Sequence, residues 1–222
     1  MNIENYFENV YFQFHSKVEE VDFYLQKSID NHRAYAETPI PRNIEHFNTA
    51  QFYFSAFINA LISTWEISKL TIQIENSILN NEHRDGLTSE PVLAADCPKF
   101  MEYFKNSTAS DHELFKFLKS ARNACAHDGT MSLNGGMGDT FNFMSDLQRY
   151  EYNDKKSKKC FEFVSLTPPQ QDAISCMLLM AIRLIPLFEV KLKKPKSIGH
   201  LDFMPEKTTS AFIEKFSCYL QK

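Results

Sequence analysis

Residues 54–72, FSAFINALISTWEISKLTI, decide the fold that the sequence predicts. Apolar side chains recur in this stretch at steps of three and four residues, which is the spacing of one face of an α-helix. The main stripe consists of Phe54, Ile58, Leu61, Trp65, Ser68 and Ile72, and it is widened by Phe57 and Ile62. A helix that is apolar over so much of its circumference is typical of the centre of a bundle. We therefore predict a central helix over residues 48–79.

The N-terminal part of the chain has the same helical spacing. Residues 3–35 are predicted to form a long helix, which ends at the proline-containing segment 38–41. The inward stripe of this helix is expected to consist of Phe7, Val10, Tyr11, Phe14, Val18, Val21 and Leu25. The chain is therefore expected to begin with two long helices separated by this break.

Two later helices have start and stop signals. Ser110 can cap a helix with Glu113 completing the capping box, and Gly129 can end that helix. Thr167 and Pro168 can begin the last long helix, because proline is tolerated at the first helical position. The buried stripes are expected to be Leu114, Leu118, Ala121 and Cys125 in the first, and Ile174, Met177, Leu178, Ala181, Ile185 and Phe188 in the second. Shorter helices are expected over residues 99–104 and 210–220.

The β-strand signal lies between these two helices. Strands are predicted over residues 140–144, 147–152 and 159–165, with a turn at 153–157, after a glycine-rich flexible connection at 130–139. We interpret this region, about residues 140–165, as a β-hairpin inserted between helices. The sequence therefore predicts an all-α, up-and-down helical bundle with an inserted β-hairpin. No strong boundary divides residues 1–222, so we expect a single domain with a C-terminal tail over about 195–222.

Composition and charge limit the classes of function. The chain has 222 residues, 43% of them hydrophobic and 23% charged, with a net charge of −4, which disfavours a protein coated for non-specific nucleic-acid binding. Its five cysteines are scattered without CxxC spacing, as suits a reducing compartment. The N-terminus lacks a secretion signal, and Arg183, Pro186 and Glu189 interrupt the longest apolar segment. We expect a cytoplasmic protein with no membrane span.

The sequence offers no cofactor or metal site. The seven histidines lack the spacing of metal ligands, and His32, His46 and His83 are isolated in or near predicted loops. The glycine-rich residues 134–138 lack the Lys-Ser/Thr that completes a phosphate-binding P-loop. We therefore expect chemistry that uses neither a cofactor nor a metal.

The chemistry is predicted to lie in residues 119–129, KSARNACAHDG, at the end of the helix that begins near Ser110. Asn123 and His127 are four residues apart and share a helix face, with Arg122 about 100° around the helix from Asn123. An arginine binds phosphate through two parallel hydrogen bonds, and a histidine transfers protons near neutral pH. These are sufficient parts for metal-free cleavage of RNA, with the 2′-hydroxyl as the nucleophile. The candidate catalytic residues are Arg122, Asn123 and His127.

Three further residues are candidates for supporting this site. Lys119 precedes the motif by one helical turn, Glu66 could pair with Arg122 across the bundle, and Asp128 could orient His127. The alternatives stay open: Glu66 is also an ordinary solvated glutamate, and Asp128-Gly129 is also a turn. Cys125 lies on the buried stripe, where core packing explains it better than nucleophilic catalysis.

The motif Arg122-Asn123-Ala-Cys-Ala-His127 resembles the Arg-x4–6-His signature of HEPN domains, which are all-helical bundles. The resemblance covers about residues 3–190 and implies a HEPN-like fold. Many members are metal-independent endoribonucleases of toxin–antitoxin, phage-defence or RNA-processing systems, and they dimerise so that two motifs meet in one cleft. It therefore implies an RNA substrate, a homodimer, and an antitoxin or defence-system partner. One toxin group has a tyrosine, modified by its antitoxin, where this chain has Gly129, so that form of regulation is not expected.

Other interpretations of the motif stay open. Arg122 and His127 can be a surface arginine and a histidine that caps a helix C-terminus. A HEPN-like dimer can also serve only to bind a nucleotide or a protein, and a purely structural helical protein is a third class. Lysines at 155–159 in the predicted hairpin can contact RNA or simply be solvated.

Overall fold

The computed structural model describes four long helices and several shorter segments of the chain. The described residues are 3–38, 44–79, 111, 114–115, 117–119, 121–122, 133–135, 141–143, 150–154, 157–161, 173–190, 192–194 and 205–219. The four long helices are α1 (Ile3–Glu37), α2 (Ile44–Leu79), α6 (Ala173–Glu189) and α7 (Pro205–Ser217). The described part of the chain is thus a mainly helical bundle, as the sequence predicts.

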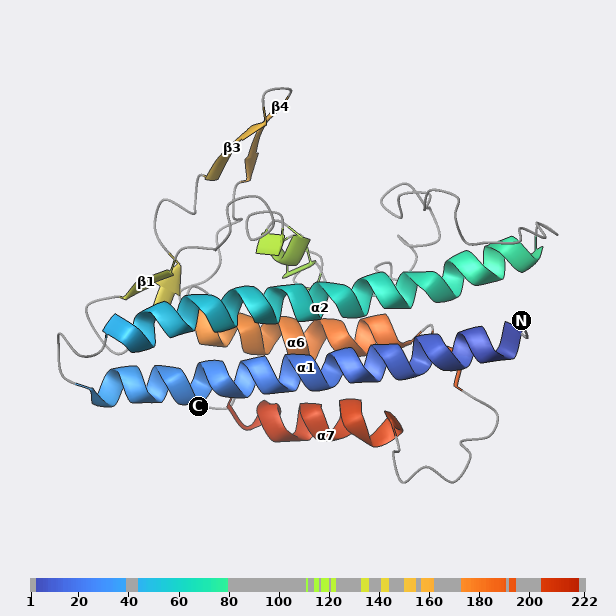
Figure 1. The fold of residues 1–222 in the computed structure, drawn as a ribbon, viewed down its shortest axis with the longest axis horizontal. Coiled ribbons are helices and arrows are strands. Elements are labelled where there is room, and N and C mark those ends of the chain that lie inside the picture. Colours follow the sequence, from blue (N-terminus) through green and yellow to red (C-terminus); the bar gives the residue numbers. More distant parts are fainter. Residues whose placement is uncertain are drawn as a thin grey trace.

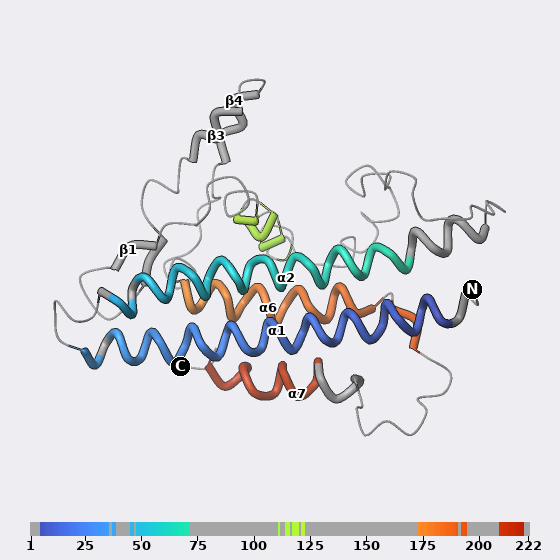
Figure 2. Tube along the Cα trace, viewed as in Figure 1, coloured from blue at the N-terminus to red at the C-terminus, as the bar shows by residue number. Residues whose placement is uncertain are grey.

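The helices α1 and α2 form a long antiparallel pair on which the others pack (Figure 1). The helix α6 contacts both, and α7 lies against α1 and α6 on the side of α1 away from α2. The Cα trace follows the same course, with α1 between α2 and α7 (Figure 2). The sequence predicts that α2 is central in the bundle. In the structure α1 is central as well, because it contacts each of the other three long helices.

The core is built from the apolar stripes that the sequence indicates. On α1 the stripe residues from Val10 to Leu25 are buried, whereas Phe7 is only half-buried. On α2 the buried set includes Phe54, Phe57, Ile58, Leu61, Ile62, Trp65 and Ser68. Full burial of one such apolar side chain contributes about 1.5–3 kcal/mol. Burial of these apolar side chains therefore stabilises the packing of α1, α2 and α6, and their helical spacing places them on one face of each helix.

A polar contact joins α1 and α2 near their connection. Asn31 Nδ2 donates a hydrogen bond to the His46 carbonyl oxygen at 2.5 Å, and His46 Nδ1 lies 3.3 Å from Asn31 Oδ1. The contact joins the last turns of α1 to the first turn of α2. It therefore sets the relative position of the two helices close to their connection.

The helix α6 contains Pro186, which cannot donate a backbone hydrogen bond. After it, the Val190 N–H donates to the Pro186 carbonyl at 3.3 Å and the Leu192 N–H donates to the Glu189 carbonyl at 2.9 Å. The sequence places the start of this helix at Thr167, but residues 167–172 lie outside the described residues. Of its predicted inward residues, Ile174 is half-buried and the other five are buried.

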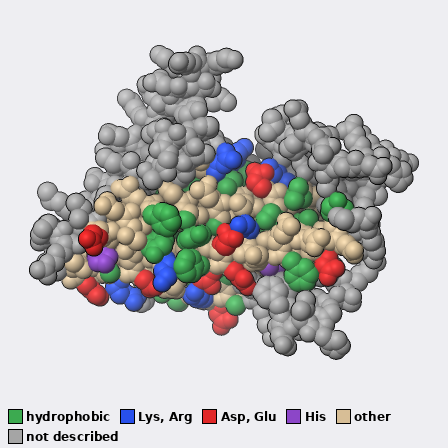
Figure 3. All heavy atoms as spheres, in the orientation of Figure 1, with side chains coloured by type: hydrophobic (Ala, Val, Ile, Leu, Met, Phe, Trp, Pro, Cys, Tyr) green, Lys and Arg blue, Asp and Glu red, His purple; other side chains and the backbone are tan. Residues whose placement is uncertain are grey.

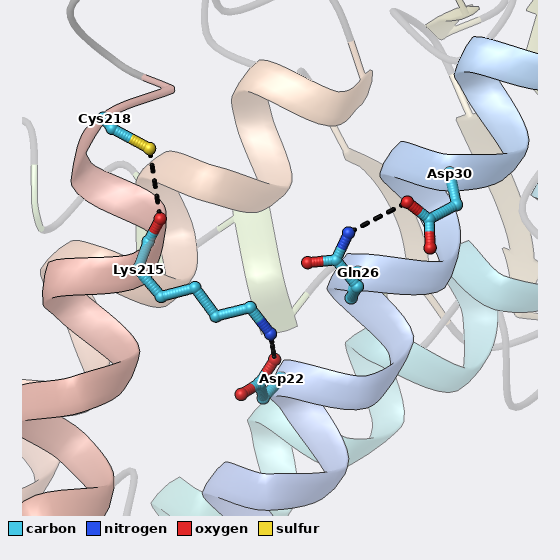
Figure 4. A network of polar contacts seen from close by, with 5 residues as sticks. All are labelled: Asp22, Gln26, Asp30, Lys215 and Cys218. Carbon is cyan, nitrogen blue, oxygen red and sulfur yellow. Dashed lines mark hydrogen bonds and ion pairs between the residues drawn. The ribbon is translucent and has the colours of Figure 1, made fainter.

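The helix α7 begins at Pro205, five residues before the predicted start. Phe212 and Phe216 are buried against the bundle, and Lys215 forms an ion pair with Asp22 of α1 (Figure 4). In the same view, Cys218 Sγ donates to the Lys215 carbonyl at 3.2 Å. The C-terminal residues predicted as a tail thus include a helix that packs on α1.

Two pairs of short strands follow the residues of the motif. The strands β1 (Leu133–Gly135) and β2 (Phe141–Phe143) are antiparallel, with Leu133 opposite Phe143, and β2 contacts α6. The strands β3 (Tyr150–Asp154) and β4 (Ser157–Phe161) are antiparallel, with Asp154 opposite Ser157. The sequence analysis predicts a flexible, glycine-rich connection over 130–139 and no strand there, whereas β1 lies within this range and pairs with β2. An insertion of this region into a HEPN-type bundle stays a prediction.

Candidate functional site

Arg122 is the last described residue of a helical segment that packs on the bundle. We call this the motif segment, and it consists of the helical residues 111, 114, 115, 117–119, 121 and 122. Its buried side chains include Leu114, Leu118 and Ala121, as the sequence predicts. Arg122 and Lys119 are exposed. Arg122 is therefore an exposed residue of a segment whose buried side chains pack in the core.

The remaining motif residues are not placed by the structure. Asn123, His127 and Asp128 lie outside the described residues, as do the predicted cap at Ser110 and Cys125. The prediction that Arg122, Asn123 and His127 border one pocket therefore stays a prediction.

An aromatic cluster, made of Trp65, Phe115 and Phe188, holds the motif segment against α2 and α6. The ring centroids of Phe115 and Trp65 are 4.9 Å apart, those of Phe115 and Phe188 5.9 Å, and those of Trp65 and Phe188 5.2 Å. Edge-to-face and tilted contacts at these distances are favourable aromatic geometries. One residue from each of three helical segments thus meets at a single point in the bundle.

Lys119 and Arg122 lie on the same side of the motif segment as Phe115. Positions four and seven residues after Phe115 fall on one helix face, and the Lys119 Nζ lies 5.9 Å from the Phe115 ring centroid. Lys119 therefore lies against Phe115 of the aromatic cluster, and Arg122 shares the same helix face. A lysine one turn before an arginine is an arrangement that can bind two oxygens of an anionic ligand.

Glu66, predicted as a partner for Arg122, forms an ion pair with Lys69 on its own helix. The Lys69 Nζ also lies 5.8 Å from the ring centroid of Trp65, one member of the aromatic cluster. Glu66 is exposed, which agrees with the alternative of a solvated glutamate. A contact between Glu66 and Arg122 stays a prediction.

The sequence did not single out Asp111, which is buried at the start of the motif segment. Its Oδ1 accepts a hydrogen bond from Arg183 Nε at 2.8 Å, and Arg183 Nη2 lies 2.8 Å from the same oxygen. In the sequence alone, Arg183 stands out only as an interruption of an apolar segment. Two features of the sequence could have indicated this pair. Asp111 lies three residues before Leu114, in line with the buried stripe, and Arg183 is an arginine in the apolar helix α6.

The sequence pattern also did not indicate a second buried polar residue, His15. His15 is fully buried on α1, its Nε2 lies 3.5 Å from Glu189 Oε1, and its ring centroid is 4.5 Å from that of Tyr11. The contact joins α1 to the last residue of α6. His15 is a polar member of the core.

The charges on the bundle are mixed in sign. Figure 3 shows acidic and basic side chains interspersed over the described part of one face, with hydrophobic side chains gathered among them. Within the described ranges, no group of three or more His, Cys, Asp or Glu side chains is arranged to hold a metal ion. None of the helices in those ranges combines the length and apolarity that a membrane span needs.

Comparisons with protein-family models, with curated proteins and with solved structures find no match to this chain. The resemblance to HEPN domains therefore depends on the motif from Arg122 to His127 and on the order of the helices around it.

Proposed function

We propose that this protein is a metal-independent endoribonuclease of toxin or phage-defence type with a HEPN-like fold. The observation that carries the proposal is the exposure of Arg122 on a segment anchored by Asp111 and the aromatic cluster. An exposed cation on a rigid support is suited to binding the scissile phosphate, because catalysis depends on charges that are already in place before the reaction.

The reaction follows from the residue types of the motif. The 2′-hydroxyl of RNA attacks the adjacent phosphorus, the bond to the 5′-oxygen breaks, and a 2′,3′-cyclic phosphate forms. Arg122 stabilises the charge on the phosphate, and His127 transfers a proton as general acid or base. Asn123 positions the phosphate or the imidazole, and Lys119 adds a cation one helical turn away.

The order of the helices supports the same proposal. An aromatic-rich α2 precedes the motif segment, and the long α6 follows it, which is the order that the HEPN resemblance implies. In this proposal the protein acts in the cytoplasm as a homodimer, with one motif from each chain in a shared cleft that binds RNA. An antitoxin or another defence-system protein would control it.

A non-catalytic, HEPN-like dimeric module that binds a nucleotide or a protein is the second candidate. The net charge of −4 and the interspersed charges of Figure 3 favour it, because proteins that bind long RNA non-specifically present a basic surface. The two candidates share the fold and the exposed Arg122. They differ in whether His127 transfers a proton.

RNA cleavage by wild type, Arg122→Ala and Arg33→Ala tests the proposal. Arg33 is a matched control, because it is an exposed arginine on α1 and lies outside the motif. The proposal expects wild type and Arg33→Ala to cleave equally, and Arg122→Ala to lose about 100-fold or more in rate, as when a group that stabilises transition-state charge is removed. Equal cleavage by all three proteins would contradict it.

A further inference from the structure

The ion pair between Asp111 and Arg183 connects the two segments that flank the predicted hairpin region. The Asp111 side chain is only 7% exposed, whereas the Arg183 side chain is 44% exposed. Burial of a carboxylate is costly unless it is paired and hydrogen-bonded, and a buried ion pair contributes little net stability even then. The main effect of this contact is therefore on the position of the motif segment and not on the stability of the fold.

The contact fixes the rotation of the motif segment about its own axis. Two nitrogens of one guanidinium group lie 2.8 Å from the same carboxylate oxygen, so a small rotation of the segment would break both contacts. Apolar contacts such as those of Leu118 tolerate small sliding movements better, because they have no preferred direction. The aromatic cluster holds the segment at Phe115, one turn after Asp111, and prevents it from moving away from α2 and α6.

Because Asp111 and Arg122 are both helical residues of the motif segment, a restraint on the rotation of the segment at Asp111 also applies at Arg122. Eleven residues of a regular α-helix make three turns plus about 20° and rise about 16.5 Å. The buried positions 111, 114, 118 and 121 follow this regular spacing. The side chains of Asp111 and Arg122 therefore leave the helix in nearly the same direction, so a rotation of the segment that displaces one also displaces the other.

We propose that Arg183 is a positioning residue, which acts through Asp111 to hold Arg122 in the orientation needed to bind a phosphate. This inference rests on the proposed ribonuclease function. It assigns to an arginine in the apolar helix α6 a role in the site that the motif itself does not indicate.

The test compares Arg183→Met, which removes the hydrogen-bond donors but keeps an unbranched side chain, with Arg183→Lys, which keeps a charged donor. Lys215→Met is the matched control, since it breaks a different interhelical ion pair, between α7 and α1. Each protein, comprising residues 1–222, is assayed for kcat and KM in RNA cleavage and for hydrogen exchange in peptides that cover residues 114–122. Thermal unfolding shows that each variant is folded.

We expect Arg183→Met to lower kcat by about tenfold to 100-fold, the cost of slightly misplacing a catalytic group, with little change in KM. Arg183→Lys should recover most of that loss, and Lys215→Met should behave as wild type. Exchange in residues 114–122 should rise in Arg183→Met and stay unchanged in α1 and α2.

Wild-type kcat together with wild-type exchange in Arg183→Met would overturn the inference. If wild-type protein leaves RNA intact, the proposed ribonuclease function is overturned instead. In that case increased exchange confined to residues 114–122 would still support the role of Arg183 in fixing the segment, and unchanged exchange would overturn that role as well.

Discussion

The Ser68 hydroxyl of α2 donates a 2.5 Å hydrogen bond to the backbone carbonyl of Phe188, near the end of α6. The last carbonyls of a helix have no partner within that helix, so a buried helix end needs a donor from elsewhere. This explains a serine in the apolar stripe of α2. The contact also holds α6 where Phe188 meets Trp65 and Phe115 of the aromatic cluster.

Ser68→Ala should lower the free energy of unfolding by about 1–3 kcal/mol, because it leaves the buried Phe188 carbonyl without that donor. Ser63→Ala is the matched control, since the Ser63 hydroxyl bonds to the Asn59 carbonyl on an exposed part of the same helix. Equilibrium unfolding in urea measures both. Equal losses in the free energy of unfolding for the two substitutions would show that the hydrogen bond to α6 contributes no more than a hydrogen bond within one helix.

Two phenylalanines on α2 should differ strongly in their contribution to stability. Phe57 is fully buried, whereas Phe52 is 62% exposed. Phe57→Ala should cost about 3–5 kcal/mol, through lost burial and the cavity left behind. Phe52→Ala should change the free energy of unfolding by less than about 0.5 kcal/mol, as surface substitutions usually do. A large cost at Phe52 in urea unfolding would mean that this side chain is covered in solution.

The ion pair between Asp22 and Lys215 should contribute little to the attachment of α7. Both side chains are more than a third exposed, so Asp22→Asn should cost less than about 1 kcal/mol. The cost should vanish in about 1 M salt, where the Debye length is about 3 Å. Unfolding in urea at low and high salt measures it. A cost that persists at high salt would indicate that Asp22 acts through a contact other than this ion pair.

Much of the helical bundle can be predicted from the sequence, because helix spacing is a local property. The stripe from Val10 to Leu25 on α1 and the stripe around Trp65 on α2 both pointed correctly into the core. Element boundaries were less predictable. The helix α7 starts at Pro205, although the apolar spacing begins only at Phe212, because proline suits a first helical turn that carries polar residues.

The polar contacts of the core could not be predicted in the same way. The partners Asp111 and Arg183 are 72 residues apart, and Ser68 lies 120 residues from Phe188. No spacing rule joins such residues, since their proximity is set by the packing of whole helices. For the same reason, the motif predicts a role for Arg122, whereas no sequence pattern indicates the buried carboxylate that anchors its segment.

The most direct test of the central claim is the analysis of RNA product ends after incubation in EDTA, with wild type compared with His127→Ala. We predict that wild type cleaves without a metal and leaves 2′,3′-cyclic phosphates, because the 2′-hydroxyl is the nucleophile. His127→Ala should remain folded and leave the RNA intact. Cleavage by His127→Ala at the wild-type rate, or intact RNA with folded wild-type protein, would contradict a ribonuclease centred on this motif.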